Sequence, residues 1–474
     1  MAKKRRRRPP RKRVGSVSYY EYHSAWWIYY RDGNKQVRRR VADNEETAAQ
    51  VAAQVNGQLA IGAPTPFSFT AVTIAELRGR FLDYHEHVVR SSLATVQRYS
   101  SATRHLEDWA KTRSSRVKAH EVDADDFVRY LRKRRVACNG HPNASKRPLR
   151  DKGIRFVIDT CRSLYNFAAK KRYLPPYYEN PFSGLGGRRC RIEDAKPIYV
   201  FDSDAELAFL KAADDWNFGI HFTLAKTGLR PGELVHLLIE DLDLDDGWLY
   251  VRNKPDLGWR IKTGRERLVP LVDELAGVLR RVVAGRTAGP VFLRQKFSAR
   301  DNGVYGTNRK HLSGIFARRL NEAEKESGQA LSRQEHARVA RALWADAGAV
   351  IPDRMRNGFI RIAKSCGLQD ATCPKSWRHT FATLLQDANV DPLVRQLTLG
   401  HSPTSGTGAG LGMTAIYTHT RSETLKREIE RAVRLWPASL AFAQRWSAAN
   451  EGGQKKHNPG SEQTGGTEGD KSHG

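Results

Sequence analysis

The spacing of apolar residues changes several times along the chain, and the changes predict a mainly α-helical protein with small β elements. Near the start, short aromatic-rich runs predict three strands, at Ser16–Tyr22, Ala25–Tyr30 and Lys35–Val41. A helix is expected to follow at Glu45–Leu59. From residue 73 to residue 185 the apolar positions recur mainly at helical spacing. A small sheet with one helix should therefore precede a helical region.

Beyond Asp202 the helical spacing returns, and a β-rich section interrupts it. Trp248–Val251 predicts a short strand, and Trp259–Lys262 with Arg265–Pro270 predicts a hairpin that carries Lys262 beside its tip. Further on, Glu423–Leu435 predicts an amphipathic helix, which docks either on a neighbouring subunit or on its own domain. We expect a mixed α/β unit here.

Charge points to the class of partner. The 80 Lys and Arg residues exceed the 51 Asp and Glu residues, which gives a formal charge of +29 and a field that attracts polyanions. The segment Lys3–Arg13 is almost entirely basic and cannot fold alone, so it is a disordered arm that either follows DNA phosphates or serves as a solubility or targeting tail. Double-stranded DNA is the expected partner. No apolar run is long enough for a membrane span, which predicts a cytoplasmic protein.

Candidate metal ligands are few in the sequence. Five cysteines are scattered without a Cys-x-x-Cys pair, which indicates neither a zinc site nor a disulfide framework. The acidic run Glu240–Asp246 lacks the glycine and distal glutamate of a calcium loop, so we expect a solvated turn before a strand. The sequence thus predicts neither a metal nor a cofactor.

Four short motifs carry the chemistry. Thr227-Gly228-Leu229-Arg230 is followed by Arg378-His379-Thr380, then by Leu399-Gly400-His401, and finally by Tyr417 within Thr414–Thr420. Their order and spacing resemble the tyrosine recombinase (phage integrase) family. In that resemblance Ile261–Arg267 corresponds to the family's hairpin lysine. The candidate catalytic residues that it implies are Arg230, Lys262, Lys375, Arg378, His401 and Tyr417.

The residue types suit phosphodiester cleavage. Two guanidiniums, Arg230 and Arg378, can clamp the non-bridging oxygens by paired hydrogen bonds, without a metal. The phenol of Tyr417 must lose its proton as it attacks, and the departing 5′ oxygen must gain one. By resemblance, Lys262 protonates that oxygen and the product is a 3′-phosphotyrosyl link, while His401 assists the attack or bonds the phosphate. Lys254 lies in the same section, and either lysine fits a plain phosphate contact.

Two departures from the family pattern matter. Lys375 stands where the family usually has histidine, as in type IB topoisomerases, and a lysine is a poor base at neutral pH, so a base role shifts to His401 or His379. His401 and Tyr417 are also farther apart than usual, because a glycine-rich segment at Ser405–Gly412 is inserted between them. We hypothesise that partner contact must order this segment before Tyr417 reaches its phosphate, which equal cleavage by monomeric and assembled protein would contradict.

The resemblance implies a site-specific recombinase that integrates or excises a mobile element, as a homo-tetramer on paired DNA sites. A type IB topoisomerase-like relaxing enzyme and a non-catalytic DNA-binding relative are the alternatives.

The predicted strands near the start contain basic residues between the aromatic ones. This pattern is consistent either with a sheet face that enters a DNA groove or with a small core that has a charged outer face. The predicted domains are a basic disordered arm (1–13), an arm-type DNA-binding domain (14–62), a helical core-binding domain of the SAM-like kind (70–190), a catalytic domain (198–445) and a disordered tail (446–474).

Overall fold

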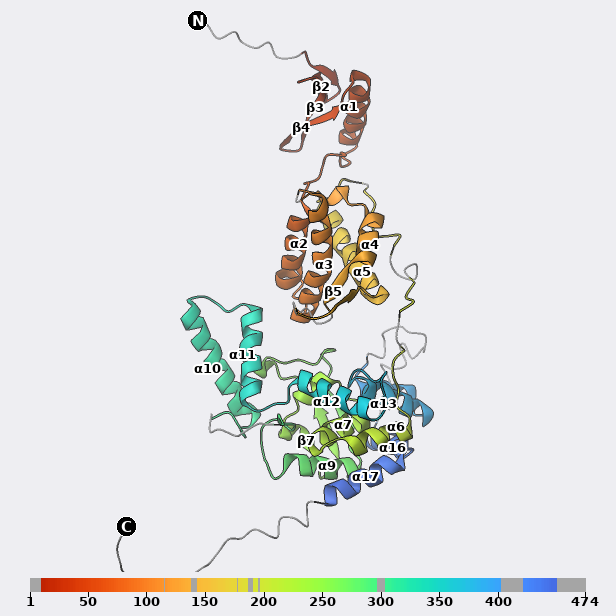
Figure 1. The fold of residues 1–474 in the computed structure, drawn as a ribbon. Coiled ribbons are helices and arrows are strands. Elements are labelled where there is room, and N and C mark those ends of the chain that lie inside the picture. The colour runs from red at the N-terminus through yellow and green to blue at the C-terminus, as the bar shows by residue number, and fades with distance from the viewer. Residues whose placement is uncertain are drawn as a thin grey trace, which may run out of the picture. The chain divides into compact units, whose positions relative to one another are not determined.

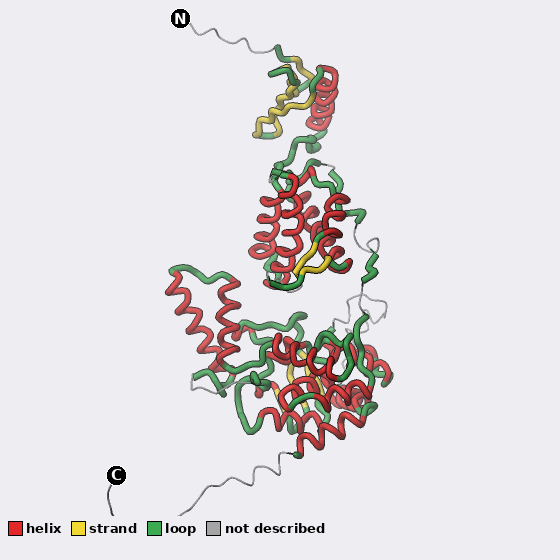
Figure 2. The backbone as a smooth tube through the Cα atoms, viewed as in Figure 1, coloured by secondary structure: helices red, strands yellow, loops and turns green. Residues whose placement is uncertain are grey.

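The computed structural model describes residues 10–114, 116–137, 143–176, 178–185, 191–194, 197–295, 303–401 and 421–449 of the 474-residue chain. The chain divides into two compact units, residues 1–196 and 197–474. Helices dominate both, and strands form three small sheets within these ranges (Figure 2). Among the described residues, no helix has the length and apolar character to cross a bilayer. The basic start and the terminal tail, at residues 1–9 and 450–474, lie outside the description.

The first unit begins with an antiparallel sheet in the order β1-β2-β3-β4, packed against one helix (Figure 1). Alternation places Tyr19, Ile28 and Tyr30 on the face toward that helix, where they form a small core. The sheet has one strand more than predicted, because the basic segment continues into a short edge strand instead of ending in a disordered arm. The elements are β1 (Lys12–Val14), β2 (Val17–Glu21), β3 (Trp26–Asp32), β4 (Lys35–Ala42) and α1 (Glu45–Ala60).

The helical part of the first unit follows, as its periodicity predicts. Its first helix starts at a capping box in which Thr73 and Glu76 satisfy each other's backbone N–H groups, and the buried Tyr165 hydroxyl donates to the Ala119 carbonyl (2.8 Å). The helices are α2 (Ile74–Asp83), α3 (Leu93–Arg113), α4 (Ala124–Lys133) and α5 (Asp151–Lys170), with a π-helical turn η1 (Tyr84–Val88), a 3-10 turn η2 (Ala119–Glu121), and a strand pair β5 (Arg135–Ala137) and β6 (Lys146–Pro148).

The second unit is built around a large apolar core in which α7 and α13 pack together. Phe201 stacks on Trp377 with ring centroids 3.9 Å apart, and both side chains are buried. The helices are α6 (Ser203–Ala212), α7 (Asp215–Thr227), α8 (Pro231–Val235), α9 (Asp273–Val283), α10 (Arg309–Ser327), α11 (Arg333–Asp346), α12 (Pro352–Ser365), α13 (Ser376–Asp387), α14 (Pro392–Leu399), α16 (Ser422–Val433) and α17 (Pro437–Ala448), with 3-10 turns η4 (Ile239–Asp241) and η5 (Pro255–Leu257).

The sheet of the second unit corrects the predicted hairpin. Its strands are β7 (Leu242–Asp243), β8 (Trp248–Val251) and β9 (Arg267–Pro270), in that order. The partner of β9 is β8, so Trp259–Lys262 is not a strand. The backbone of Trp259 is already used, because its N–H and C=O both bond Lys254. Lys262 still lies on a turn, closed by a hydrogen bond from Gly264 N to Ile261 O (2.9 Å).

The second unit also contains a helix pair and an amphipathic helix. Helices α10 and α11 pair around a small core of their own that also contains Leu257 (Figure 1). The amphipathic helix α16 buries Leu425, Ile429 and Val433 in the large core of the second unit. Of the two alternatives for this helix, the structure therefore supports packing on its own domain.

Candidate active site

Arg230 lies where one helix ends and the next begins. Helix α7 ends at Gly228, whose left-handed conformation (φ +61°) turns the chain, and a Cβ there would lie 2.4 Å from Phe381. Pro231 then occupies the first position of α8, with Arg230 as its N-cap. These requirements explain why Thr-Gly-Leu-Arg-Pro can be recognised in the sequence. The Arg230 side chain remains one-fifth exposed.

Glu233, in the first turn of α8, joins two arginines. Its carboxylate accepts from Arg230 N (2.9 Å) and Nη1 (2.8 Å), and from Arg267 Nη2 (2.6 Å) and Nη1 (3.2 Å). Burial by itself would raise the pKa of Glu233, but the hydrogen bonds and charge of Arg267, together with the hydrogen bonds of Arg230, outweigh it and hold that pKa below its ordinary value. Glu233 thus stays ionised and fixes both guanidiniums.

Arg267 on β9 connects this cluster to α14. Its Nε donates to the Thr398 carbonyl (2.8 Å), and the absence of a side chain at Gly400 makes room for it, since a Cβ there would lie 3.1 Å from the guanidinium. Arg267 and Glu233 were not predicted as members of the site from the sequence. The available signals were the glutamate three residues after the helix N-cap and an arginine on a strand whose other residues are apolar.

Arg378 on α13 is the most buried arginine of the candidate set. Its Nη1 donates to the Gly228 carbonyl (2.8 Å), and its Nη2 bonds the Leu399 carbonyl and lies 3.0 Å from His401 Nε2. Burial, followed by the charge of Arg230, lowers the pKa of Arg378 to about 10. At neutral pH the group is still a cation, so the fold holds a buried positive charge on backbone carbonyls.

His401 follows α14 and its C-terminal glycine, Gly400. Its backbone N–H bonds the Gln396 carbonyl (2.9 Å), and partial desolvation, then the charges of Arg378 and Arg230, lowers the pKa of the imidazole. A guanidinium has only donors, so Nε2 is the acceptor in this contact and the neutral ring carries its proton on Nδ1. Arg230, Arg378 and His401 are therefore brought together by the fold.

Lys375 and His379 lie on the first turn of the same helix as Arg378. Lys375 is exposed at the N-cap, and His379 is half-buried one turn later. Desolvation, then the charges of Lys375 and Arg378, lowers the pKa of His379. Lys375 therefore presents an exposed cation three residues before Arg378 on the same helix.

The two candidate lysines differ sharply in exposure. Lys254 is 1% exposed and pairs with the equally buried Asp241 (Nζ–Oδ2 2.7 Å), whereas Lys262 is exposed on its turn. The structure therefore removes Lys254 as a phosphate contact. Of the acidic run that was expected to be a solvated turn before a strand, Glu240, Asp245 and Asp246 are exposed, but Asp241 is buried and caps Leu238 N as well (2.9 Å).

Tyr417 and the glycine-rich segment at Ser405–Gly412 lie outside the described residues. The described chain stops at His401 and resumes at Arg421.

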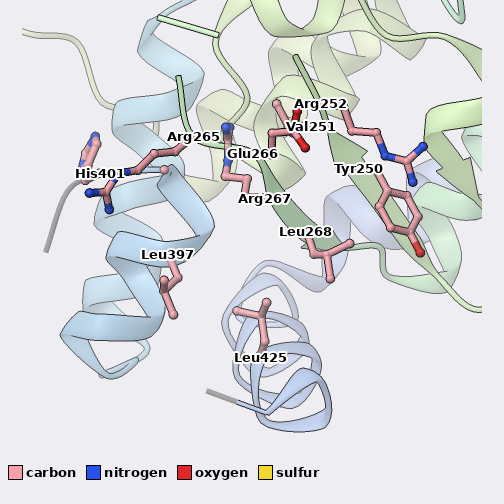
Figure 3. A pocket seen from close by; sticks show the side chains of 11 residues that line it. Tyr250, Val251, Arg252, Arg265, Glu266, Arg267, Leu268, Leu397, His401 and Leu425 are labelled. Carbon is pink, nitrogen blue, oxygen red and sulfur yellow. The ribbon is translucent and has the colours of Figure 1, made fainter. Parts of the chain in front are cut away.

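A groove of about 690 Å³ borders His401. Figure 3 shows Leu397 of α14 and Leu425 of α16 directed into it, with Arg265, Arg267 and His401 along its rim.

The cluster is suited to an anion. Its positive charges are held in place before any ligand binds. Arg230 and Arg267 bond the Glu233 carboxylate. Arg378 bonds a backbone carbonyl and contacts His401. In the described part of the chain no three His, Cys, Asp or Glu side chains gather as a metal site would require. The arrangement can bind and polarise a phosphodiester through its own cations.

Comparison with known proteins identifies relatives of this chain. Residues 201–348 match the model of the Phage integrase family, a span that includes Arg230 and Lys262 and ends before Arg378. The chain is 25% identical over 206 residues to tyrosine recombinase XerA of Pyrococcus furiosus, a match that covers 44% of this chain and about half (51%) of that protein. It is 23% identical over 342 residues to a tyrosine recombinase of Pseudothermotoga lettingae, which covers 72% of this chain and 92% of that one.

Solved structures with a similar chain course include the Tn1549 transposon integrase in complex with circular intermediate DNA, with 19% identity, a TM-score of 0.42, and coverage of 76% of this chain and 99% of that one. A lambda integrase dimer bound to a COC′ core site matches with 13% identity and a TM-score of 0.41, over 87% of this chain and 96% of that one.

Proposed function

Because the chain belongs to the phage integrase family of tyrosine recombinases, we propose that it cuts and rejoins DNA at specific sites through a 3′-phosphotyrosyl intermediate. The observation that carries the proposal is the cluster of Arg230, Arg378 and His401, held together by carbonyl oxygens and the Glu233 carboxylate. Such a cluster stabilises negative charge where it develops, on the non-bridging oxygens of the phosphate under attack.

The reaction divides among named side chains. The Tyr417 oxygen forms a bond to phosphorus while the bond from phosphorus to the 5′ oxygen breaks. The Tyr417 proton passes to a base, and we assign this role to His401, which is neutral at pH 7 because its pKa is lowered and whose Nε2 accepts the proton once it separates from Arg378. Lys262 delivers a proton to the leaving 5′ oxygen, and Lys375 contacts the phosphate. The phosphotyrosyl bond retains the energy of the broken bond, so a second DNA end reseals it without a nucleotide cofactor.

The first unit supplies further DNA contacts in this proposal. Alternation places Tyr20, Trp27, Tyr29 and Arg38 on the sheet face opposite α1, with Arg38 lying over the rings of Tyr20 and Trp27. This face suits an arm-type DNA-binding domain, and the helical part that follows suits a core-binding domain. A homo-tetramer on paired sites, acting in integration or excision of a mobile element, completes the proposal.

Detection of a covalent protein–DNA adduct tests it. Nicked duplexes from the DNA that flanks the gene are incubated with the full-length protein, and adducts are detected on a denaturing gel. We expect an adduct with the wild type and with Tyr199→Phe, a control tyrosine in the same unit, and none with Tyr417→Phe. Tight binding without an adduct would instead favour the non-catalytic alternative. Relaxation of supercoiled circles by monomer would favour the topoisomerase-like one.

A further inference from the structure

One asparagine organises the turn that carries Lys262. We call residues 252–266, between β8 and β9, the lysine loop. Asn253 at its start accepts a hydrogen bond from Ile261 N at Oδ1 (2.9 Å) and donates one from Nδ2 to the Gly264 carbonyl (2.8 Å). Its own backbone N–H donates to Glu266 Oε1 (2.8 Å). A single amide side chain therefore holds both residues that flank Lys262 and Thr263.

Asn253 is in turn anchored by the first residue of α10. Arg309 Nη2 donates to the Asn253 carbonyl (3.1 Å), and the same guanidinium pairs with Asp256 through Nε–Oδ2 (2.9 Å) and Nη2–Oδ1 (2.5 Å). The Arg309 backbone N–H bonds Glu240 Oε1 (3.0 Å). This bidentate pair is of the kind that fixes geometry, because both partners are planar.

The base of the lysine loop is buried against the α10–α11 pair. Leu257 belongs to the core of that pair, and Trp344 Nε1 on α11 donates to the Leu257 carbonyl (3.1 Å). The buried ion pair between Lys254 and Asp241 also holds this stretch of the loop against the protein interior. Lys254, Leu257 and Ile261 are buried, whereas the turn that carries Lys262 is exposed.

We propose that Asn253 is a positioning residue for Lys262, and that Arg309 anchors Asn253 for this purpose. The inference rests on the role of Lys262 as proton donor in the proposed function. A proton reaches the leaving oxygen only if the ammonium lies within hydrogen-bond reach during bond cleavage. The Lys262 side chain is long and flexible, so fixing its backbone reduces the conformations that it must lose to reach that geometry.

A change of leaving group tests the proposal. The cleaved phosphodiester is first mapped with wild-type protein, and two duplexes are then compared, one with the natural 5′ oxygen and one with sulfur in its place. A thiolate, with a pKa near 8.5, leaves without receiving a proton, whereas an alkoxide requires one. Loss of the proton donor, or of its position, should therefore slow cleavage of the oxygen substrate alone.

For Asn253→Ala in the full chain we expect cleavage of the oxygen substrate to fall by about 10- to 100-fold. Cleavage of the sulfur substrate should stay near the wild-type rate. Lys262→Ala should show the same pattern more strongly, and Asn321→Ala, on the exposed side of α10, should match the wild type on both substrates.

The outcomes separate two failures. If sulfur restores Lys262→Ala but not Asn253→Ala, the positioning role is wrong and the proposed function stands. If sulfur restores neither variant, Lys262 is not the proton donor and both proposals fail at that residue.

Amide hydrogen exchange gives a readout that needs no DNA. Arg309→Ala should accelerate exchange of the Ile261 amide, since the acceptor of that amide is the side chain of Asn253, whose backbone carbonyl Arg309 bonds. The matched control is Arg319→Ala, which removes an ion pair of α10 with Asp346 (2.7 Å) that does not touch the lysine loop. Unchanged exchange at Ile261 in Arg309→Ala would overturn the anchoring role.

Discussion

Arginine is used in two different ways in the two units. In the second unit Arg378 and Arg267 are buried and held by carbonyls and a carboxylate. On the sheet of the first unit, Arg38 is exposed and lies over the rings of Tyr20, Tyr22 and Trp27 at 5.5, 4.8 and 5.2 Å, and in the described chain no carboxylate pairs with it. In the proposed function, the buried cations are fixed before DNA binds, whereas the exposed cation can adjust to the DNA backbone.

The difference predicts a large cost for disturbing a buried charge and a small one for removing an exposed charge. The largest effect should come from Lys254→Met, which leaves the buried Asp241 carboxylate without its partner. We expect a loss of about 3–5 kcal/mol in the free energy of unfolding, measured by urea denaturation of the full-length protein. Lys111→Met is the control, because Lys111 is exposed and its partner Glu107 keeps a second cation, Arg78, so the change should be about 0.5 kcal/mol or less. Similar losses in the two variants would contradict the comparison.

Arg378→Lys should have the next largest effect, this time on cleavage. Lysine keeps the positive charge, but one ammonium cannot bond the Gly228 and Leu399 carbonyls, face His401 and still clamp a phosphate. We expect adduct formation in a single turnover to slow by about 10²- to 10³-fold. Arg361→Lys, at an exposed pair with Asp214, should cleave like the wild type. A slowing of less than tenfold would mean that a positive charge at position 378 is enough for cleavage and that the shape of the guanidinium is not required.

Glu233→Gln should have a smaller effect that depends on pH. The folded-state pKa of Glu233 lies below its ordinary value of 4.5, so on acidification the unfolded chain takes up the proton first. The stability that the carboxylate contributes is therefore present above pH 4.5 and is lost as pH falls through the lowered pKa. At pH 7 we expect the variant to lose about 1.5–3 kcal/mol, the worth of hydrogen bonds to a charged group, and the deficit should shrink in acid. Parallel stability curves for the two proteins from pH 7 to pH 3 would contradict this assignment.

The same contrast explains what could be predicted from the sequence. Arg230 was predictable because a glycine turn and a proline at the helix start are local requirements. Helical spacing likewise predicted α2 to α5, because one apolar stripe per helix faces a common core. Such signals lie within a few residues of one another.

Contacts between distant segments were not predictable. Arg267 reaches Glu233 across 34 positions and the Thr398 carbonyl across 131, and no local pattern encodes either contact. The pairing of β9 with β8 was missed for a related reason, since the turn at Thr263-Gly264 suggested the nearer partner. The burial of Asp241 was missed because its acidic neighbours are exposed or half-exposed and only Lys254 explains it.

The smallest effect should come from Arg38→Ala on the sheet of the first unit. An exposed cation over aromatic rings contributes about 0.5–1 kcal/mol, so the variant should unfold almost like the wild type. If Arg38 contacts a phosphate, DNA affinity should fall for all sequences alike, and the slope of log affinity against log salt should decrease by about 1. Arg39→Ala is the matched control, because Arg39 pairs with Ile28 and thus points to the opposite face of the sheet. An equal change of slope in both variants would show that DNA affinity depends on the total charge of the strand and not on the face from which an arginine projects. That result would contradict the assignment of this face, with its rings and Arg38, as the surface that meets DNA.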